Sequence, residues 1–351
     1  MAQKRKSCSE NENHYDLVYN FDQSAPPTSS INVAVNHLRP VDAGEILSRY
    51  EIVEKLGEGG FSAVFEGIRL KDGLKVALKF ALKTDAMEYI SIPGHPAPLP
   101  LEVALMMLAN KGPSVPQIVQ LLEWQDQDGY YIMVLERPSP CEDLFEFLEH
   151  QGGVLSEDLA RLIMWQVAQA AHMCCRRGVL HRDIKLENLL FNKETLEVKL
   201  IDFGCGDLLK TSAYETFWGT EMYCPPEFKK SGKYHGKPAT VWSLGVLLFE
   251  LVCGDPPKNK DLNKIEAGIW SKPGLSKDCC HLIQSCLQRK PKHRIGLGKI
   301  ILHDWFKAQN CIALLSGKYR ATVCGDPPNT NDLDMIDPSL WSKPSLSKVN
   351  E

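Results

Sequence analysis

The sequence predicts an α+β protein with two unequal lobes: a small β-rich lobe that contains one main helix, and a larger α-rich lobe. Before Pro140, short apolar segments separated by turn residues are typical of strands. After Pro140, apolar residues recur at helical spacing. The length of 351 residues allows one large domain or two modest ones, with a sizeable hydrophobic core.

The β-rich lobe begins near Tyr50. A turn at Asp72-Gly73 joins its second and third strands, and one helix is expected over residues 101–108. The strands are expected at residues 50–55, 63–68, 75–80, 117–124 and 130–135.

The α-rich lobe has a clear helix start. Ser156 is a good N-cap, and Glu157 and Asp158 suit the first turn of the helix that follows it. A hairpin and two further helices come later, and the lobe ends near Trp305-Phe306. The hairpin is expected at residues 188–191 and 198–201, and the helices at 241–252 and 277–288.

Composition argues against several classes of partner. The 40 basic and 44 acidic residues give a formal net charge of −4, which favours neither nucleic acid nor an anionic membrane as the main partner. The apolar run from Val241 to Cys253 is expected to be too short to span a bilayer, and the polar N-terminus resembles no secretion signal. The twelve cysteines form no C-x-x-C pair, so we expect reduced thiols and a cytoplasmic or nuclear protein. No feature indicates a dimer, and we expect a monomer.

Both ends of the chain differ from its centre. Residues 1–47 are polar without a sustained period, and we interpret them as a mostly disordered arm. The tail, residues 307–351, partially duplicates residues 252–277 at an offset of 71 residues. It lacks the preceding apolar helix and is not expected to fold alone. The simpler interpretation is a loosely ordered remnant, and the alternative is a segment that competes for the surface where the original docks.

A glycine-rich segment lies between the first two predicted strands. It reads Leu56-Gly-Glu-Gly-Gly-Phe-Ser-Ala-Val64, and its glycines let backbone N–H groups approach phosphate oxygens closely. Alone this is a weak signal, because glycine turns are common in hairpins. The strand–loop–strand context disfavours a Rossmann turn, and the Walker A pattern is absent.

A lysine follows on the third predicted strand, in Val76-Ala-Leu-Lys79. A lysine on an otherwise apolar strand is costly unless it is paired. Lys79 is either a surface residue of an edge strand or a cation for the α- and β-phosphates of a nucleotide, held by a glutamate on a helix. Glu102, on the helix after Pro100, is the best candidate for that glutamate.

The most specific motif is His181-Arg-Asp-Ile-Lys-Leu-Glu-Asn188, which Ile201-Asp-Phe-Gly204 follows. Asp183 can accept a hydroxyl proton and orient the nucleophile, while Lys185 can neutralise charge on a transferred phosphoryl group. Asn188 and Asp202 can supply oxygen ligands to magnesium, which prefers hard donors. This chemistry depends on alignment and charge stabilisation rather than on covalent help.

Together these motifs resemble the eukaryotic protein kinase family over about residues 50–306. Pro225-Pro-Glu227 stands where kinases have Ala-Pro-Glu, and Arg294 is the expected buried partner of Glu227. The resemblance implies ATP and Mg²⁺ as cofactors, and Lys185 with Gly219-Thr220 implies a Ser/Thr rather than a Tyr kinase. It also implies a bilobal protein kinase fold, with a domain over 48–306, an N-lobe over about 48–135, a hinge over about 136–140 and a C-lobe over about 141–306.

Within that family the chain is most similar to the Pim kinases. The similar segments are Leu135-Glu-Arg-Pro-Ser-Pro140, Asp143-Leu-Phe-Glu-Phe147, Gly178 to Lys185, Tyr234-His-Gly236, Ala239 to Gly245 and Val252-Cys-Gly-Asp255. Pro138 has no N–H, so the hinge offers adenine one hydrogen bond fewer than usual, and the Glu136 carbonyl remains as an acceptor. The resemblance implies a nucleotide site formed by Leu56, Gly57, Glu58, Gly59, Gly60, Phe61, Ser62, Val64, Ala77, Lys79, Leu135 as gatekeeper, Glu136, Leu190 and Ile201.

The chain departs from the family at several positions. Ser62 replaces the third loop glycine, and Thr240 stands where most kinases have an aspartate that ties the catalytic loop. Leu186 and three lysines stand where Pim kinases are acidic; the lysines are Lys258, Lys260 and Lys264. Pim kinases favour Ser/Thr preceded by arginines, so we expect a basic preference that is retained but weaker. The acidic residues expected to bind such substrates are Asp143, Glu146, Glu187, Glu250 and Asp255.

The activation segment, residues 202–227, holds several hydroxyl groups, and Arg182 is a candidate partner for a phosphate there. The resemblance to Pim kinases implies a segment that is ordered without phosphorylation. Cys205 follows Gly204 and is either a residue facing the nucleotide or a small buried side chain.

Two alternatives to an active protein kinase remain. A pseudokinase scaffold would be consistent with Ser62, Thr240 and the tail, although the residues that touch phosphate or metal are intact. A small-molecule kinase is disfavoured by Gly219-Thr220 and the Pro-Pro-Glu segment, which shape a peptide groove in protein kinases.

Overall fold

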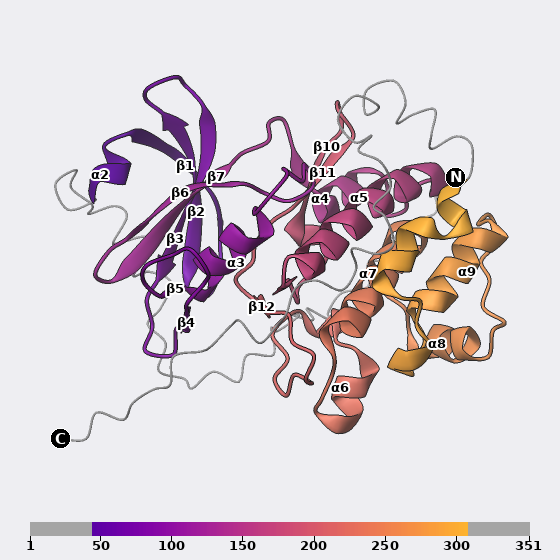
Figure 1. The fold of residues 1–351 in the computed structure, drawn as a ribbon. Coiled ribbons are helices and arrows are strands. Elements are labelled where there is room, and N and C mark those ends of the chain that lie inside the picture. Colours follow the sequence, from indigo (N-terminus) through magenta and orange to yellow (C-terminus); the bar gives the residue numbers. More distant parts are fainter. Residues whose placement is uncertain (1–43, 308–351) are drawn as a thin grey trace, which may run out of the picture.

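An antiparallel five-stranded sheet forms the first lobe of the protein, whose computed structural model describes residues 44–307 (Figure 1). The strand order is β1-β2-β3-β7-β6. Helix α3 (Leu101–Ala109) lies beside this sheet, toward the second lobe. The strands are β1 (Tyr50–Glu58), β2 (Ser62–Arg69), β3 (Lys75–Leu82), β6 (Leu121–Asp126) and β7 (Tyr130–Glu136).

The fourth predicted strand starts later than the sequence pattern indicates. Gln117 and Val119 hydrogen bond to the second lobe instead of to the sheet: Val119 N donates to the Leu200 carbonyl at 3.0 Å, and Leu200 N donates to the Gln117 carbonyl at 2.8 Å. The apolar segment 117–124 therefore bonds to both lobes, and apolar periodicity alone does not predict such a division.

The boundary of the N-terminal arm also needs correction. Residues 44–47 form a short helix, α2 (Gly44–Leu47), and the Ile46 side chain is only 1% exposed. It packs with Tyr50, Phe65 and Leu78 in a core on one side of the sheet. The arm predicted over 1–47 is therefore wrong for its last four residues, and residues 1–43 lie outside the described part of the chain.

Helices dominate the second lobe. The Ser156 hydroxyl caps α5 by accepting a hydrogen bond from Leu159 N at 3.4 Å, as its position predicts. Helix α7 starts at Gly236, earlier than expected, because a proline in the first turn costs no helical hydrogen bond. The helices are α4 (Leu144–His150), α5 (Glu157–Arg176), α6 (Pro226–Ser231), α7 (Gly236–Cys253), α8 (Asn259–Glu266) and α9 (Lys277–Cys286).

In residues 44–307, short strands form three smaller sheets. The predicted hairpin is β10 (Leu189–Asn192) with β11 (Glu197–Leu200), to which β8 (Glu142–Asp143) adds a third strand. Strand β9 (Val179–Leu180) pairs with β12 (Asp207–Leu208), and β4 (Tyr89–Ile90) pairs with β5 (Leu99–Pro100). Short 3₁₀ helices cover 186–188, 221–223, 291–293, 297–302 and 304–307.

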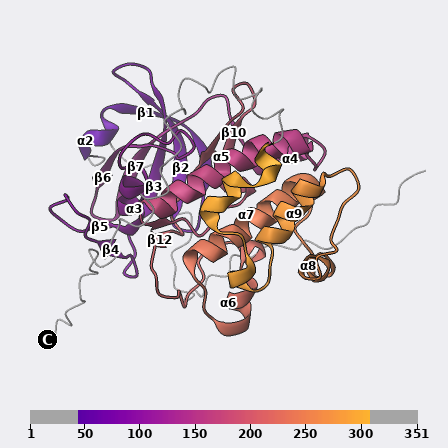
Figure 2. The ribbon, with the colours of Figure 1, turned by 45° about the vertical axis from the view of Figure 1, so that its right-hand side comes forward.

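Helix α7 is the centre of the second lobe. It packs against α5 and α9 in both ribbon views (Figure 2). By length and composition the whole helix, Gly236–Cys253, could cross a membrane, because it extends beyond the apolar run Val241–Cys253. Most of the helix is buried inside the lobe, however, so protein already covers its apolar surface.

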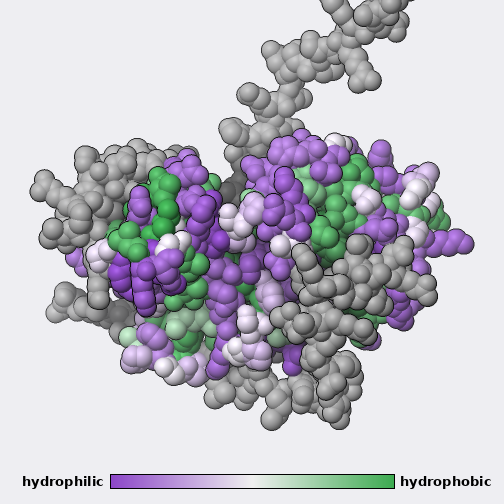
Figure 3. Space-filling model, turned by 90° about the horizontal axis from the view of Figure 1, so that it is seen from above, coloured by the Kyte–Doolittle hydropathy of each residue, from purple (hydrophilic) through white to green (hydrophobic). Residues whose placement is uncertain are grey.

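Exposed apolar side chains are spread over both lobes. Seen from above, hydrophobic patches lie on both lobes and are separated by mostly hydrophilic residues (Figure 3). Among the exposed large side chains, Leu56 and Leu70 belong to the first lobe, and Phe145, Ile269 and Leu302 belong to the second. The duplicated tail, apart from Lys307, lies outside the described residues.

Candidate active site

Lys79 forms two ion pairs that connect three elements. Its Nζ lies 2.6 Å from Glu102 Oε1 on α3 and 2.8 Å from Asp202 Oδ1 in the segment after β11. The pairing with Glu102 is the one that the sequence predicts. The Tyr131 hydroxyl donates to the other Glu102 oxygen at 3.1 Å and fixes that carboxylate. Lys79 is only 6% exposed, so these partners hold its charge in a set position.

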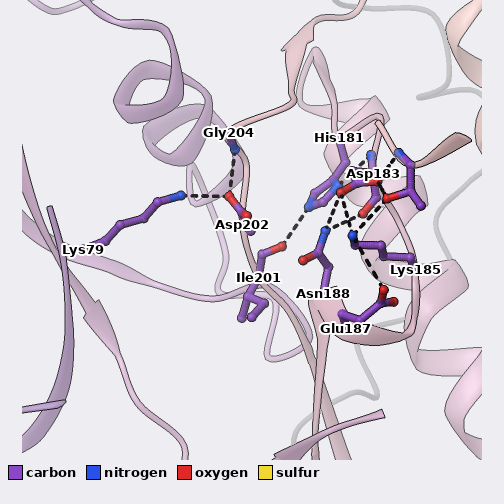
Figure 4. A network of polar contacts seen from close by, with 10 residues as sticks. Lys79, His181, Asp183, Lys185, Glu187, Asn188, Ile201, Asp202 and Gly204 are labelled. Atoms are coloured by element: carbon purple, nitrogen blue, oxygen red, sulfur yellow. Dashed lines mark hydrogen bonds and ion pairs between the residues drawn. The ribbon is translucent and has the colours of Figure 1, made fainter. Parts of the chain in front are cut away.

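The charges at this site stabilise one another. Burial alone would lower the pKa of Lys79, but the two carboxylates outweigh it and raise the pKa above its ordinary value. The charge of Lys79 is the main cause of a strongly lowered pKa at Asp202, which also accepts a hydrogen bond from Gly204 N. Lys79 and Asp202 are therefore charged at neutral pH, and Figure 4 shows Lys79 extending toward Asp202.

The Asp183 carboxylate is held by hydrogen bonds from two residues and by an ion pair with a third (Figure 4). Its Oδ1 accepts from the backbone N and the Oγ1 of Thr220, both at 2.9 Å. Its Oδ2 accepts from Asn188 Nδ2 at 3.0 Å. Lys185 Nζ lies 3.6 Å from that Oδ2 and donates to Thr220 Oγ1 at 2.9 Å. These contacts fix the direction of the Asp183 carboxylate and place a cation beside it.

Asn188 and Asp202 have oxygens that suit a hard cation. Asn188 uses its amide nitrogen for Asp183, which leaves its Oδ1 for a ligand. Asp202 binds Lys79 and Gly204 through Oδ1 alone. Within residues 44–307 no group of three or more His, Cys, Asp or Glu side chains could hold a metal. The oxygens of Asn188 and Asp202 fit Mg²⁺, which binds through one or two protein ligands and completes its shell with water and substrate phosphates.

His181 and Arg182 hold the surrounding backbone. Asp183 N donates to His181 Nδ1 at 3.3 Å, so the proton is on Nε2, which donates to the Ile201 carbonyl at 3.0 Å. Burial is the main cause of a lowered pKa at His181, so its ring is neutral. Arg182 has a positive φ of 68° and donates to the carbonyls of Cys205 and Gly206 at 2.5 and 2.7 Å. The guanidinium that we expected to meet a phosphate thus already binds the activation segment.

The glycine-rich loop is exposed, as a phosphate-binding loop must be. Gly57 lies near the end of β1 and pairs with Val64, whereas Gly59 and Gly60 lie in the turn between β1 and β2. Gly59 N donates to the Ser62 carbonyl at 2.7 Å. None of these glycines has a positive φ, and neither does Ser62, which starts strand β2. Serine is therefore compatible with the loop backbone. Phe61 is half-buried, and the Glu58 carboxylate pairs with Lys55 instead of facing the loop interior.

The residues expected around adenine come from both lobes and are only partly covered. Ala77 and Leu135 are cross-strand partners on β3 and β7, and Leu190 lies on β10 in the other lobe. Leu56 is 42% exposed, and Val64, Ala77, Leu135, Leu190 and Ile201 are half-buried. Apolar side chains that keep this exposure are available to a flat apolar ligand.

The connection between the lobes is tied on both sides. Arg137 pairs with the buried Glu66 of β2 at 2.9 Å, and Glu136 pairs with Lys199 of β11 at 2.9 Å. The Pro138 carbonyl accepts a hydrogen bond from Cys141 Sγ at 2.8 Å. Pro138 has no N–H, and its carbonyl is already used by Cys141.

The five acidic residues expected to bind substrate differ in exposure. Glu146, Glu187 and Asp255 are exposed, and Asp143 caps α4 by accepting from Glu146 N at 2.9 Å. Glu250 is different, because it is only 6% exposed and accepts a hydrogen bond from Tyr223 OH. Burial, helped by the charges of Glu187 and Asp255, raises its pKa to about 7.

Comparison with known proteins decides the family. The protein kinase domain model matches residues 50–306. The chain belongs to the protein kinase family. It is 42% identical to serine/threonine-protein kinase pim-2 of Danio rerio over 262 residues, which cover 73% of this chain and 84% of that protein. It is 36% identical to prk-2 of Caenorhabditis elegans over 264 residues, covering 74% and 58%, and 34% identical to the human SNF-related kinase over 272 residues, covering 75% and 34%.

These similarities identify a Pim-like Ser/Thr protein kinase and confirm the bilobal fold. The kinase signatures fall where the fold needs them. The expected pair of Arg294 with Glu227 is present, with Nη1 2.8 Å from Oε1, and it joins the Pro-Pro-Glu segment to the end of the domain. Thr240 donates to the Gly236 carbonyl of its own helix at 3.1 Å instead of tying the catalytic loop. A cavity lined by Thr240, Arg182 and Ser243 has room for about one water molecule.

Sequence reasoning missed two residues that shape the kinase site. Thr220 binds both Asp183 and Lys185, and Tyr131 binds Glu102. Neither lies in the motif of its partner. The Gly219-Thr220 pair is the one sequence signal that could have pointed to Thr220. No local sequence pattern marks Tyr131. Burial raises the pKa of the Cys205 thiol to about 12, so this side chain is not a reactive thiolate at neutral pH.

Proposed function

We propose that this kinase transfers the γ-phosphoryl group of ATP to Ser or Thr in protein segments with arginines upstream, without prior phosphorylation of its activation segment. The arrangement of Asp183, Thr220 and Lys185 carries the proposal. It combines an oriented carboxylate with a lysine at 3.6 Å, which are the groups that phosphoryl transfer to a hydroxyl requires. The further expectation is a monomer in the cytoplasm or nucleus.

Each charged residue has a role in this mechanism. Asp183 orients the acceptor hydroxyl and takes its proton, and Lys185 stabilises the charge on the transferred group. Lys79, fixed by Glu102, binds the α- and β-phosphates. Asn188 and Asp202 would hold Mg²⁺, which would supply charge neutralisation at the phosphate oxygens. The covalent change is small, so alignment of these groups accounts for most of the rate.

The contacts of Arg182 support activity without activation-segment phosphorylation. In kinases that depend on this modification, the phosphate supplies a negative partner that orders the segment. Here Arg182 binds the Cys205 and Gly206 carbonyls and lies 3.7 Å from Asp207. Tyr214 of the same segment donates to the Leu208 carbonyl at 2.6 Å and stacks on Tyr234. These contacts within the protein can therefore order the activation segment without a phosphate group.

Exposed acidic residues of the C-lobe support the arginine preference. Glu187 is exposed beside Lys185, Asp255 is exposed at the end of α7, and Glu146 is exposed on α4. A guanidinium binds carboxylates in a bidentate way that lysine cannot match. Lys258 lies 3.4 Å from Asp255, which weakens the local negative potential. We therefore expect a weaker preference for arginine than a surface with only acidic residues would give.

A peptide array tests the proposal. The unphosphorylated full-length protein is incubated with ATP, Mg²⁺ and Ser peptides that carry arginine, lysine or leucine at each upstream position. We expect the arginine peptides to be phosphorylated best, and a Glu187→Gln variant to lose part of that preference while it keeps its rate on neutral peptides. Equal labelling of arginine and leucine peptides would refute the basic preference. Activity that appears only after phosphorylation of the activation segment would refute the proposal that the kinase is active without this modification.

A further inference from the structure

The duplicated tail repeats a segment whose docking contacts are visible. In the described part of the chain, residues 255–275 leave α7, form α8 and return to α9; this is the docked segment. The repeat segment is residues 326–346, which match it at an offset of 71. Helix α8 lies at the rim of the C-lobe, away from the N-lobe, in both ribbon views. The docked segment is therefore peripheral, while α7 and α9 pack directly on each other.

Four apolar side chains hold the docked segment, and the repeat segment has an apolar residue at each of these positions. Ile265 and Trp270 are buried, at 1% and 5% exposure, and Trp270 stacks on Phe249 of α7 with ring centroids 5.3 Å apart. Leu262 and Leu275 pack partly buried against the same core. The residues Leu262, Ile265, Trp270 and Leu275 correspond to Leu333, Ile336, Trp341 and Leu346 of the repeat, respectively.

The polar docking contacts are also matched. Gln284 Nε2 donates to the backbone carbonyl of Trp270 at 2.6 Å, which any residue can accept. Lys272 Nζ donates to the Val252 carbonyl at 2.6 Å, and the repeat segment has Lys343 at this position. Arg289 donates to Glu266 at 2.6 Å and to Asn263 at 2.8 Å. The corresponding repeat residues are Asp337 and Asp334, so both positions keep an acceptor for Arg289.

Most positions that differ are exposed. The three lysines of the docked segment that the repeat lacks, Lys258, Lys260 and Lys264, face solvent, and the repeat has Asn, Asn and Met there. Four lysines and three acidic residues give the docked segment a net charge of +1, whereas one lysine and four aspartates give the repeat −3. The buried face is thus kept and the outer face is more acidic.

Two turns make the repeat the weaker occupant. Gly268 and Gly274 of the docked segment have φ values of +69° and +90°, a region that favours glycine. The repeat has serine at both positions. Side chains other than glycine are strained there, so the docked segment holds the site in most molecules. The eighteen residues between Lys307 and Asp326 span up to about 60 Å when extended, which is long enough to cross a domain of this size.

We propose that the repeat segment of the same chain exchanges with the docked segment at the surface formed by Phe249, Gln284 and Arg289. The exchange is a two-state equilibrium in which the core helices stay in place. It replaces the docked segment, which includes Asp255 and has a net charge of +1, with a segment of net charge −3 in which Asp326 takes the position of Asp255. On the proposed function, the exchanged form therefore binds arginine-rich substrates more tightly, but the exchange itself does not depend on catalysis.

Hydrogen–deuterium exchange of the full-length chain tests this directly. Four proteins are compared: the wild type, Trp270→Ala, Trp341→Ala and the double variant. In Trp270→Ala the repeat becomes the better occupant, so we expect the backbone amides of residues 333–337 to exchange at least ten times more slowly than in the double variant. We also expect the double variant to lose more thermal stability than the two single variants together, because only it has no intact occupant.

Controls separate docking from general effects. Leu340 corresponds to Ile269, which is 71% exposed, so Leu340→Ala in the Trp270→Ala background should leave the protection unchanged. Repeat amides that exchange at the unfolded rate in all four proteins would overturn the proposal, as would protection that rises with protein concentration. If Trp270→Ala does not fold, Trp341→Ala decides: slower exchange of residues 259–266 than in the wild type supports the proposal, and unchanged exchange overturns it.

Discussion

Glu250 is a buried carboxyl group whose replacement by glutamine should change how protein stability depends on pH. It lies on α7, accepts a hydrogen bond from Tyr223 OH and is only 6% exposed. Burial is the main cause of its raised pKa, and the charges of Glu187 and Asp255 raise it further, to about 7 from an ordinary 4.5. Glu250→Gln keeps the size and removes the titrating proton.

The sign and size follow from proton linkage. The folded protein binds the Glu250 proton more tightly than the unfolded chain, so the free energy of unfolding falls as pH rises from about 4.5 to above 7. Each tenfold change in proton affinity corresponds to about 1.4 kcal/mol, so the full penalty in the wild type is roughly 3 kcal/mol. The glutamine variant does not have this penalty. Its stability relative to the wild type should therefore be higher at pH 8 than at pH 4.5 by about 3 kcal/mol.

Urea denaturation at both pH values measures this difference. Comparing the variant with the wild type at each pH cancels the change in the Tyr223 hydrogen bond and leaves the titration of Glu250. The matched control is Glu146→Gln on exposed α4, for which we expect less than about 0.5 kcal/mol between the two pH values. A Glu250→Gln variant with no relative gain at pH 8 would refute the assignment of a buried, raised-pKa carboxyl.

Three further predictions follow from single contacts. Glu227→Ala leaves the buried Arg294 without its carboxylate and should lower the free energy of unfolding by about 3 kcal/mol in urea denaturation; a loss below 1 kcal/mol would contradict a buried pair. Gly245→Ala would place a Cβ 2.7 Å from Cys286 Cβ and should lower stability by about 1–3 kcal/mol, whereas an unchanged melting temperature would show that α9 can move. Lys79→Met should reduce phosphoryl transfer at least about 100-fold with a native circular dichroism spectrum, and transfer above a tenth of wild type would contradict its role.

The sequence predicted the residues that lie within contiguous motifs. The ion pair of Lys79 with Glu102 follows from a lysine that an apolar strand tolerates only when it is paired, together with the position of the next helix. Asp183 and Asn188 lie on one short loop, so their spacing alone brings them together. The order of strands and helices followed from apolar periodicity, with boundaries displaced by a few residues.

Contacts between distant segments could not be predicted in this way. Thr220 reaches Asp183 across 37 residues of chain, and no periodic pattern encodes that contact. Burial of Glu250 depends on how the 3₁₀ helix over residues 221–223 places Tyr223 over α7, so a carboxyl that the sequence suggests for the surface is enclosed. Ile46 is buried because the strands around it leave space for a short helix, whereas its own neighbourhood in the sequence is polar.

The most direct test of the central claim is transfer of radiolabel from ATP with Mg²⁺ to an arginine-rich Ser peptide, with the wild type compared to Asp183→Asn. Asparagine keeps the size of the side chain but cannot take the hydroxyl proton. We predict labelling by the wild type and a loss of at least about 100-fold in the variant, with both proteins folded. Equal background labelling by both proteins, with several peptides tried, would contradict an active kinase and favour a nucleotide-binding scaffold.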